Sequence, residues 1–238
     1  MQWIPETSPS RKARVTGFVY LVTILAGIFA QGFVSNRLIS FADASGTATR
    51  ILANRGLYEL SFTVYMIEMA CNIAITALFY DLLKPVSRSL SLHAAFFSLF
   101  GCGIKTVSRV FYLAPLFVLD PPTYLRVFSG EQLKSLALTM LRINDIGAGM
   151  ALGFFGVYAL FKGWLIVRST FLPHWLGVLS ILAGFGLLAF LSPTLGSRLF
   201  PIIATVGLIG AVAQIFWLIV FGLDEPRWLA QASTAGEW

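Results

Sequence analysis

The 238-residue chain is 57% hydrophobic and only 12% charged, whereas a soluble domain averages roughly 45–50% apolar and 25% charged residues. This composition excludes an ordinary soluble protein and predicts one all-α domain, residues 1–238, embedded in a membrane. The net charge of +6 does not indicate a nucleic-acid partner, because the basic residues lie mostly in short turns and at helix ends, where they set topology and contact lipid headgroups.

Six apolar segments have about the length that a helix needs to cross a hydrocarbon core of roughly 30 Å. They predict a polytopic helix bundle with transmembrane helices at residues 15–35, 57–83, 90–118, 132–165, 174–192 and 201–222. The first segment follows a basic patch, residues 11–14, and has no small-residue cleavage site. We therefore expect it to remain as a membrane helix, since a secretory signal has a shorter apolar region.

A short amphipathic helix is predicted between the first two spans, lying at the outer membrane surface. Asp43 or Ser45 can cap its start and Gly56 can end it. Its apolar face is expected to hold Ala44, Ala48, Ile51 and Leu52.

The connections on either side of the third span are short and specific. The tight turn from Lys84 to Ser89 makes the second and third spans antiparallel neighbours. Pro121 and Pro122 are expected to stop the third span, because proline cannot donate to a helical hydrogen-bond ladder.

The fourth span is predicted to be unusually long. Ser129 and Gln132 have the spacing of a capping box, which places its start near Gly130. Continued to Arg168, this helix would measure roughly 58 Å, which is too long for one crossing. Either its first turns project from the membrane, or it kinks at residues 144–147. Residues Gly149 and Gly153 give it a smooth face for helix packing.

The distribution of Lys and Arg predicts that both termini are cytoplasmic. With the N-terminus inside, eight of these residues lie on the inner side: Arg11, Lys12, Arg14, Lys84, Arg88, Lys162, Arg168 and Arg227. Six lie on the outer side: Arg37, Arg50, Arg55, Arg126, Lys134 and Arg198. The bias is small, and the basic patch ahead of the first span decides the orientation.

Five short segments resemble, in order, the landmarks of one protein family. They are Arg11–Leu21, Asp43–Asn54, Leu83–Val86, Phe128–Leu133 and Phe171–Gly177. The family consists of bacterial six-helix integral membrane proteins catalogued as domain of unknown function four-three-eight-six. The resemblance implies six helices in a bacterial cytoplasmic (inner) membrane. It carries no established activity, so it transfers no catalytic residue.

Ionisable side chains also occur within the predicted spans, where each costs about 2.5–3.5 kcal/mol and is normally paired or functional. Glu68 on the second span and Lys105 on the third each lie about 10 Å below the predicted outer boundary. We therefore expect an ion pair between these neighbouring helices. Gln31, late in the first span, lies at comparable depth.

Two interpretations of these charges remain open. In the first, spans two, three and four enclose a polar cavity that opens to the outer leaflet and binds an anionic headgroup, phosphate or carboxylate. Its candidate ligand-binding residues are Glu68, Asn72, Lys105, Arg109, Arg142, Asn144, Asp145, Tyr65 and Tyr112. In the second, Arg109 and Arg142 reach the outer headgroups, Glu59 and Asp145 neutralise them, and the pair of Glu68 with Lys105 is only a structural clamp.

Other chemistry is not indicated by the sequence. The two histidines, His93 and His174, lie near inner helix ends, so a bis-histidine haem inside the bundle is not expected. Cys71 and Cys102 lie within apolar runs, and no disulfide or metal–thiolate site is predicted. We expect no cofactor and no metal, and no catalytic residue can be assigned.

Three functions are compatible with this sequence. The first is a protein that binds or transports a small anionic or lipid-like molecule, with Glu68 as a protonation-coupled carboxylate in the transport version. The second is an intramembrane enzyme acting on a lipid or isoprenoid, with Glu68 or Asp145 as general acid. The third is a non-catalytic subunit of a larger membrane complex. The sequence favours the first, with membrane lipids as its immediate partners.

Overall fold

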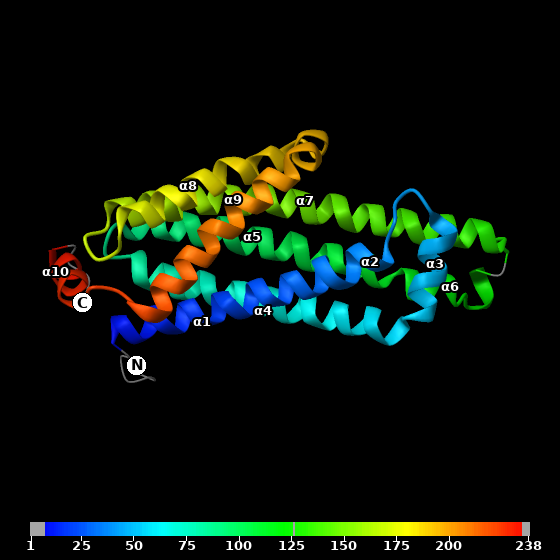
Figure 1. The fold of residues 1–238 in the computed structure, drawn as a ribbon, viewed down its shortest axis with the longest axis horizontal. Coiled ribbons are helices and arrows are strands. Elements are labelled where there is room, and N and C mark those ends of the chain that lie inside the picture. Colours follow the sequence, from blue (N-terminus) through cyan, green and yellow to red (C-terminus); the bar gives the residue numbers. More distant parts are fainter. Residues whose placement is uncertain (1–7, 126, 235–238) are drawn as a thin grey trace.

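The computed structural model describes residues 8–125 and 127–234, so Arg126 of the topology count lies outside the described residues. These residues form helices joined by loops and turns, with no strand among them, which confirms the all-α fold (Figure 1). The α-helices are α1 (Pro9–Gly27), α2 (Asn36–Leu38), α3 (Ala44–Ala53), α4 (Arg55–Leu83), α5 (Arg88–Leu113), α6 (Pro115–Leu119), α7 (Gly130–Arg168), α8 (His174–Leu188), α9 (Pro193–Val220) and α10 (Glu225–Thr234). A π-helical segment, η1 (Ile28–Ser35), continues α1, and two 3-10 turns are η2 (Thr123–Leu125) and η3 (Ala189–Leu191).

Six helical stretches in the described residues are long and apolar enough to cross a membrane, which confirms the six-span prediction. Their bounds are Pro9–Leu38, Arg55–Leu83, Arg88–Leu119, Gly130–Arg168, His174–Leu191 and Pro193–Val220. Two spans begin earlier than predicted. Ser8 caps α1 by accepting a hydrogen bond from the Arg11 amide at 3.3 Å. Helix α9 passes through Pro201, which sequence analysis took as its start, at the cost of one backbone hydrogen bond.

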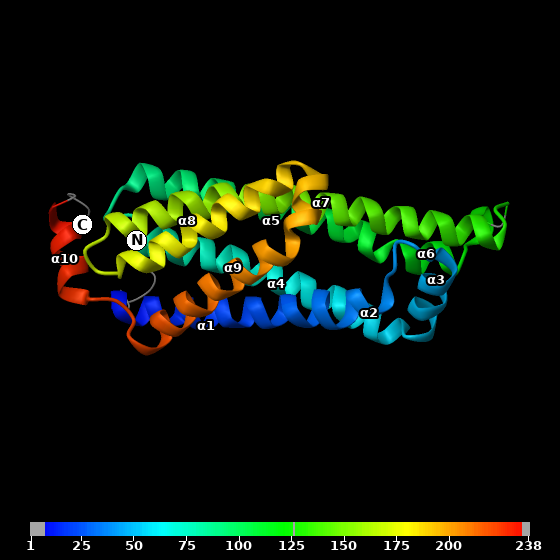
Figure 2. The ribbon, with the colours of Figure 1, turned by 45° about the horizontal axis from the view of Figure 1, so that its top comes forward.

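The six spans form a ring in chain order. Helix α1 packs on α4, α4 on α5, α5 on α7, α7 on α8 and α8 on α9, and α9 closes the ring by packing on α1. Figure 2 shows that α9 crosses the bundle obliquely, from the α7–α8 side to the start of α1. The start of α1 and helix α10 lie at the same end of the bundle.

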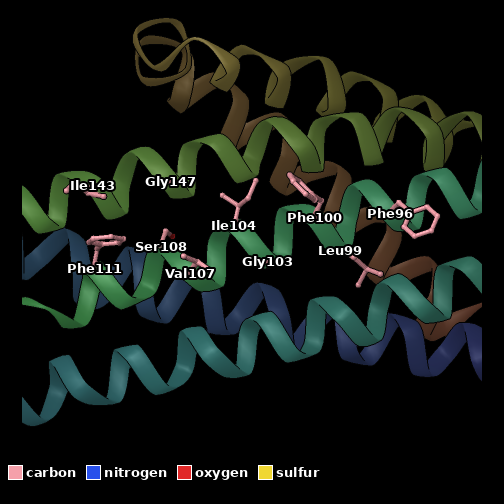
Figure 3. A pocket seen from close by; sticks show the side chains of 10 residues that line it. All are labelled: Phe96, Leu99, Phe100, Gly103, Ile104, Val107, Ser108, Phe111, Ile143 and Gly147. Atoms are coloured by element: carbon pink, nitrogen blue, oxygen red, sulfur yellow. The ribbon is translucent and has the colours of Figure 1, made fainter.

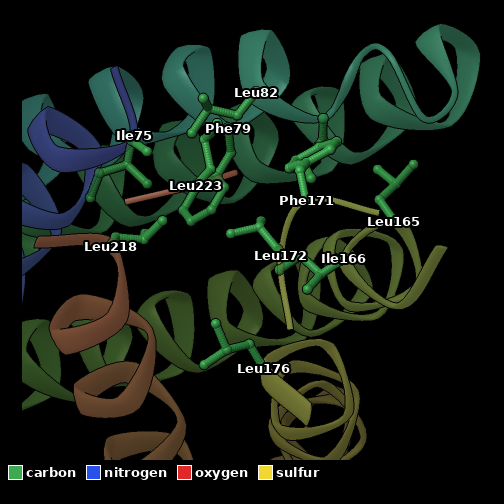
Figure 4. Close-up of a cluster of buried hydrophobic side chains, with 12 residues drawn as sticks. Ile75, Phe79, Leu82, Leu165, Ile166, Phe171, Leu172, Leu176, Leu218 and Leu223 are labelled. Carbon is green, nitrogen blue, oxygen red and sulfur yellow. The ribbon is translucent and has the colours of Figure 1, made fainter. Parts of the chain in front are cut away.

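Two clusters of buried apolar side chains hold the ring together. The first, at the end near α10, joins α4, α7, α9 and the loop before α8 through residues such as Phe79, Leu165, Phe171 and Leu218 (Figure 4). The second cluster joins the other ends of the first three spans to α7 through Val34, Tyr58, Tyr112 and Leu141 among others. Close packing of these side chains stabilises contacts between the helices toward both ends of the bundle.

Helix α7 runs through residues 144–147 without interruption, and its first turns extend past the ends of α8 and α9. The helix is therefore not broken at these residues, and its projection from the membrane stays a prediction. The predicted capping box is confirmed, because Ser129 accepts from the Gln132 amide while the Gln132 side chain accepts from the Ser129 amide. The projecting turns are not isolated, since α3 and α6 pack against them.

The short helix of the first loop is confirmed as α3, with Asp43 Oδ1 accepting from the Gly46 amide at 2.7 Å. Two details of its prediction were wrong. Leu52 is 45% exposed, and Thr47 takes its place on the buried face beside Ala48 and Ile51. Gly56 does not end the helix, because the chain turns at Asn54 and Gly56 already belongs to α4.

Two features near the ends of spans were not predicted. The third span is divided at Ala114, since Pro115 has no amide hydrogen to continue the ladder of α5. Asp224 lies just before α10 and pairs with Arg227 at 3.1 Å.

Candidate functional site

The predicted ion pair between the second and third spans is present. Lys105 Nζ lies 2.7 Å from Glu68 Oε1, with side chains only 14% and 9% exposed. The second carboxylate oxygen, Oε2, is buried without a hydrogen-bond partner among the described residues. Gly27 of α1 leaves room for this carboxylate, because a Cβ there would lie 3.7 Å from Glu68 Oε1. Asn72 lies one turn further along the same helix, α4, and its side-chain amide donates to the Glu68 backbone carbonyl at 3.0 Å.

Arg109 lies one turn further toward the C-terminal end of α5 and is 3% exposed. Its Nη1 donates to Asn144 Oδ1 of α7 at 3.0 Å, and its guanidinium carbon is 3.5 Å from the centre of the Tyr65 ring. No carboxylate in the described part of the chain pairs with it, and its Nε has no hydrogen-bond partner there. The cation is thus held by an amide and an aromatic face, an interaction worth about 2 kcal/mol when desolvated.

A network of hydroxyl groups ties the first span to this region. Tyr65 donates to Gln31 Oε1 at 2.7 Å, and Ser35 Oγ lies 3.0 Å and 3.1 Å from the hydroxyls of Tyr65 and Tyr112. Ser61 Oγ is 2.9 Å from the Tyr112 hydroxyl. Gln31 and Ser35 both lie in η1, and π-helical turns occur frequently at functional sites.

A cavity of about 210 Å³ lies directly outside this network, between the end of the first span and α7. Its walls are formed by Gln31, Ser35, Asn36, Ile39, Phe41, Tyr112, Leu141, Asn144 and Asp145. Gln31, Asn36 and Asp145 are exposed, so the cavity opens at the side of the bundle. Arg109 lies behind its wall, bonded to Asn144.

The structure brings the predicted residues together only in part. Of the nine candidates, Tyr112, Asn144 and Asp145 line the cavity, and the others lie outside its lining. The first span, absent from the predicted cavity, supplies one wall. The signal that could have found it is the polar trio of Gln31, Ser35 and Asn36, of which the first two are four residues apart and share a helix face.

Arg142 and Asp145 of α7 are not neutralised as the structural interpretation expected. Arg142 is exposed and places its guanidinium carbon 4.0 Å from the centre of the Phe41 ring. Glu59, expected to neutralise this part of the bundle, pairs with Arg55 at 3.0 Å, because the two are four residues apart on α4. Arg142 and Asp145 therefore have no ion-pair partner within 4.0 Å among the described residues, and of the two only Asp145 lines the cavity.

Lys162 was counted with the inner topology charges, and this was wrong. It is 5% exposed, inside the ring, where Nζ donates to Gln214 Oε1 of α9 at 3.0 Å. The Gln214 amide nitrogen in turn donates to Ser180 of α8 at 2.6 Å. The rings of Phe79 and Tyr158 lie 4.8 Å and 5.3 Å from the ammonium group. No sequence signal pointed to Gln214, because α7 and α9 are not consecutive spans.

A larger cavity, of about 650 Å³, is a different feature. It is an apolar groove at the α5–α7 contact, with side chains such as Phe100, Ile104 and Phe111 around it (Figure 3). None of its lining residues is ionisable. In residues 8–125 and 127–234, no three His, Cys, Asp or Glu side chains converge to hold a metal ion. Of these two cavities, the smaller one has the more polar lining.

Comparisons with known proteins show which family the chain belongs to. A protein of Archaeoglobus fulgidus, described as an uncharacterized protein, is 27% identical over 179 residues, which cover 72% of this chain and 93% of that protein. No solved structure matches the chain. The model of the family described as Domain of unknown function (DUF4386) matches residues 15–222, which confirms the resemblance seen in the sequence. The chain is a multi-pass membrane protein that belongs to the DUF4386 family.

Proposed function

We propose that this protein binds a small anionic or lipid-like molecule in the cavity between η1 and α7. The observation that carries the proposal is Arg109, a buried cation next to the cavity wall with no carboxylate partner in the described residues. An uncompensated charge at membrane depth is costly, and a bound anion would offset that cost. Lys105 does not add to the attraction, because Glu68 neutralises it.

The polar groups of the cavity support an anionic ligand. Asn144 Oδ1 accepts from Arg109, so its amide nitrogen is turned the other way and can donate into the cavity. Arg142, next to Phe41 of the cavity wall, adds a second cation. Because the opening is at the side of the bundle, a lipid headgroup could enter without leaving the membrane interface.

Binding is favoured over chemistry at Glu68 by the position of that carboxylate. Glu68 is engaged by Lys105 and does not line the cavity. A proton donor for a bound lipid should instead contact the ligand. The direct 2.7 Å contact of Glu68 with Lys105 supports a second role, that of a clamp between the second and third spans.

We also propose that the chain lies in a cytoplasmic membrane with both termini inside. The support is the basic patch at the start of α1 together with Lys84 and Arg88 in the turn at the same end of the bundle. Basic residues next to spans are retained on the cytoplasmic side. The cavity then faces the outer leaflet.

The binding proposal is tested with the purified full chain by counting phospholipids that remain bound in native mass spectrometry. We expect Arg142→Gln to lower the bound phospholipid about tenfold, since a charge-assisted contact is lost. The matched control is Arg37→Gln, because Arg37 also lies near a phenylalanine ring, but that ring, Phe33, does not line the cavity, whereas Phe41 next to Arg142 does. Equal retention by both variants would refute the proposal.

A further inference from the structure

The cavity has a carboxylate in its wall and a cation beside it. Arg142 and Asp145 are three residues apart on α7, a spacing that permits an ion pair. They form none within 4.0 Å, and the Arg142 guanidinium lies over the Phe41 ring. Asp145 and Phe41 both belong to the cavity wall, and Arg142 lies outside the lining. A cation and a carboxylate therefore lie next to one cavity without direct contact.

A ligand that is only anionic would not suit this arrangement. Its negative group would approach Arg142 and the Asn144 amide, but it would also be repelled by the Asp145 carboxylate across a cavity of only about 210 Å³. A positive group in the same ligand removes this repulsion, since Asp145 then gains an ion-pair partner.

We propose that the ligand is a zwitterion, with a phosphate or carboxylate facing Arg142 and Asn144 and a primary ammonium facing Asp145. This inference rests on the proposed function and narrows its ligand class. The cavity has room for about seven water molecules, which suits a small headgroup without acyl chains. The same chemistry occurs in phosphatidylethanolamine and in free phosphoethanolamine.

The test measures the affinities of three phospholipids for the full-length protein in detergent by native mass spectrometry. We expect phosphatidylethanolamine to bind about tenfold more tightly than phosphatidylglycerol, which has no amine, and more tightly than phosphatidylcholine, whose ammonium cannot donate hydrogen bonds. Asp145→Asn should abolish this preference. Glu59→Gln is the matched control, because that carboxylate is paired with Arg55 outside the cavity.

The possible results separate the two proposals. If phosphatidylglycerol binds as tightly as phosphatidylethanolamine, or if Asp145→Asn leaves the ratio unchanged, the zwitterion is refuted while anion binding stands. If none of the lipids binds and Arg142→Gln has no effect, the proposed function fails as well. If free phosphoethanolamine competes with the lipid, the headgroup is recognised without its acyl chains. If phosphatidylethanolamine is preferred but free phosphoethanolamine does not compete, the ligand is a membrane lipid.

Discussion

The ion pair of Glu68 with Lys105 is stable only while both charges are present. Both side chains are largely buried, so that each ion depends on the other to offset the cost of leaving water. The free Oε2 of Glu68 adds to this dependence, because it gains no hydrogen bond from the described residues. Removal of one partner should therefore cost more than removal of both.

The first prediction concerns this pair. Lys105→Met should lower the free energy of unfolding by about 3 kcal/mol, because it leaves a buried carboxylate without a cation. The double variant Lys105→Met with Glu68→Leu should recover most of that loss in thermal unfolding of the detergent-solubilised protein. Lys134→Met is the control, since its partner Glu131 is exposed, and it should change stability little. Equal losses in the single and double variants would show that the pair is not a clamp.

Lys162 and Gln214 give the second prediction. Gln214→Leu leaves the buried ammonium without its acceptor and should cost about 1–3 kcal/mol. Adding Lys162→Met removes the orphaned cation, so the double variant should be more stable than Gln214→Leu alone. Chemical unfolding of the three variants in micelles measures this. Strictly additive losses would contradict the direct contact.

At the scale of single residues, the sequence predicts side-chain pairs only between consecutive spans. The position of Glu68 opposite Lys105 follows from counting residues on either side of one tight turn, because both helices rise by the same distance per residue. The contact of Arg109 with Asn144 also joins consecutive spans but depends on helix rotation, and that of Lys162 with Gln214 depends on closure of the ring. Neither property is encoded in residue spacing, and so the cavity was predicted without the first span.

Among the elements, the contact between α7 and α8 depends most strictly on small residues. Gly163 of α7 and Gly177 of α8 face each other, and a Cβ on Gly163 would lie 2.7 Å from the Gly177 carbonyl oxygen. Gly153, part of the predicted smooth face, lies against Leu191 of η3. Close backbone approach of this kind lets membrane helices associate without a hydrophobic driving force.

The third prediction tests that contact. Gly163→Ala should destabilise the protein by about 1–3 kcal/mol, because overpacking forces two backbones apart. Gly103→Ala is a matched control on α5, where a Cβ would meet nothing within 4 Å, and it should be neutral or slightly stabilising. The melting temperatures of the two variants are compared by thermal unfolding monitored by size-exclusion chromatography. Equal melting temperatures would contradict the close approach.

Element ends were predictable where a local hydrogen bond defines them. The capping box at Ser129 and the cap at Asp43 were correct because side chain and backbone partners lie within three residues. The π-helical turn η1 was not predicted. Its hydroxyl and amide contacts with α4 and α5 are formed only in the assembled bundle.

For the whole molecule, the fourth prediction concerns orientation. In a Cys71→Ala, Cys102→Ala background, a cysteine replacing the exposed Ser45 of α3 should react with a membrane-impermeant maleimide in intact cells. A cysteine replacing Ser233 of α10 should react only after the membrane is permeabilised, because six spans return the chain to its starting side. Labelling of Ser233→Cys in intact cells would reverse the proposed topology.

Apolar composition alone was sufficient to predict six spans, because a membrane helix needs about 20 apolar residues whatever its neighbours are. The ring and its side opening could not be predicted, since they depend on α9 crossing from α7 and α8 to the start of α1. The cavity is a consequence of the assembled bundle.

The most direct test of ligand binding is a cryo-electron microscopy structure of the full chain extracted with its native lipid. We predict density for a headgroup in the cavity between η1 and α7, with an anionic group about 2.7–3.2 Å from the Asn144 amide nitrogen and close to Arg142. A cavity filled only by ordered water, with lipid density confined to other surfaces of the bundle, would contradict the binding site.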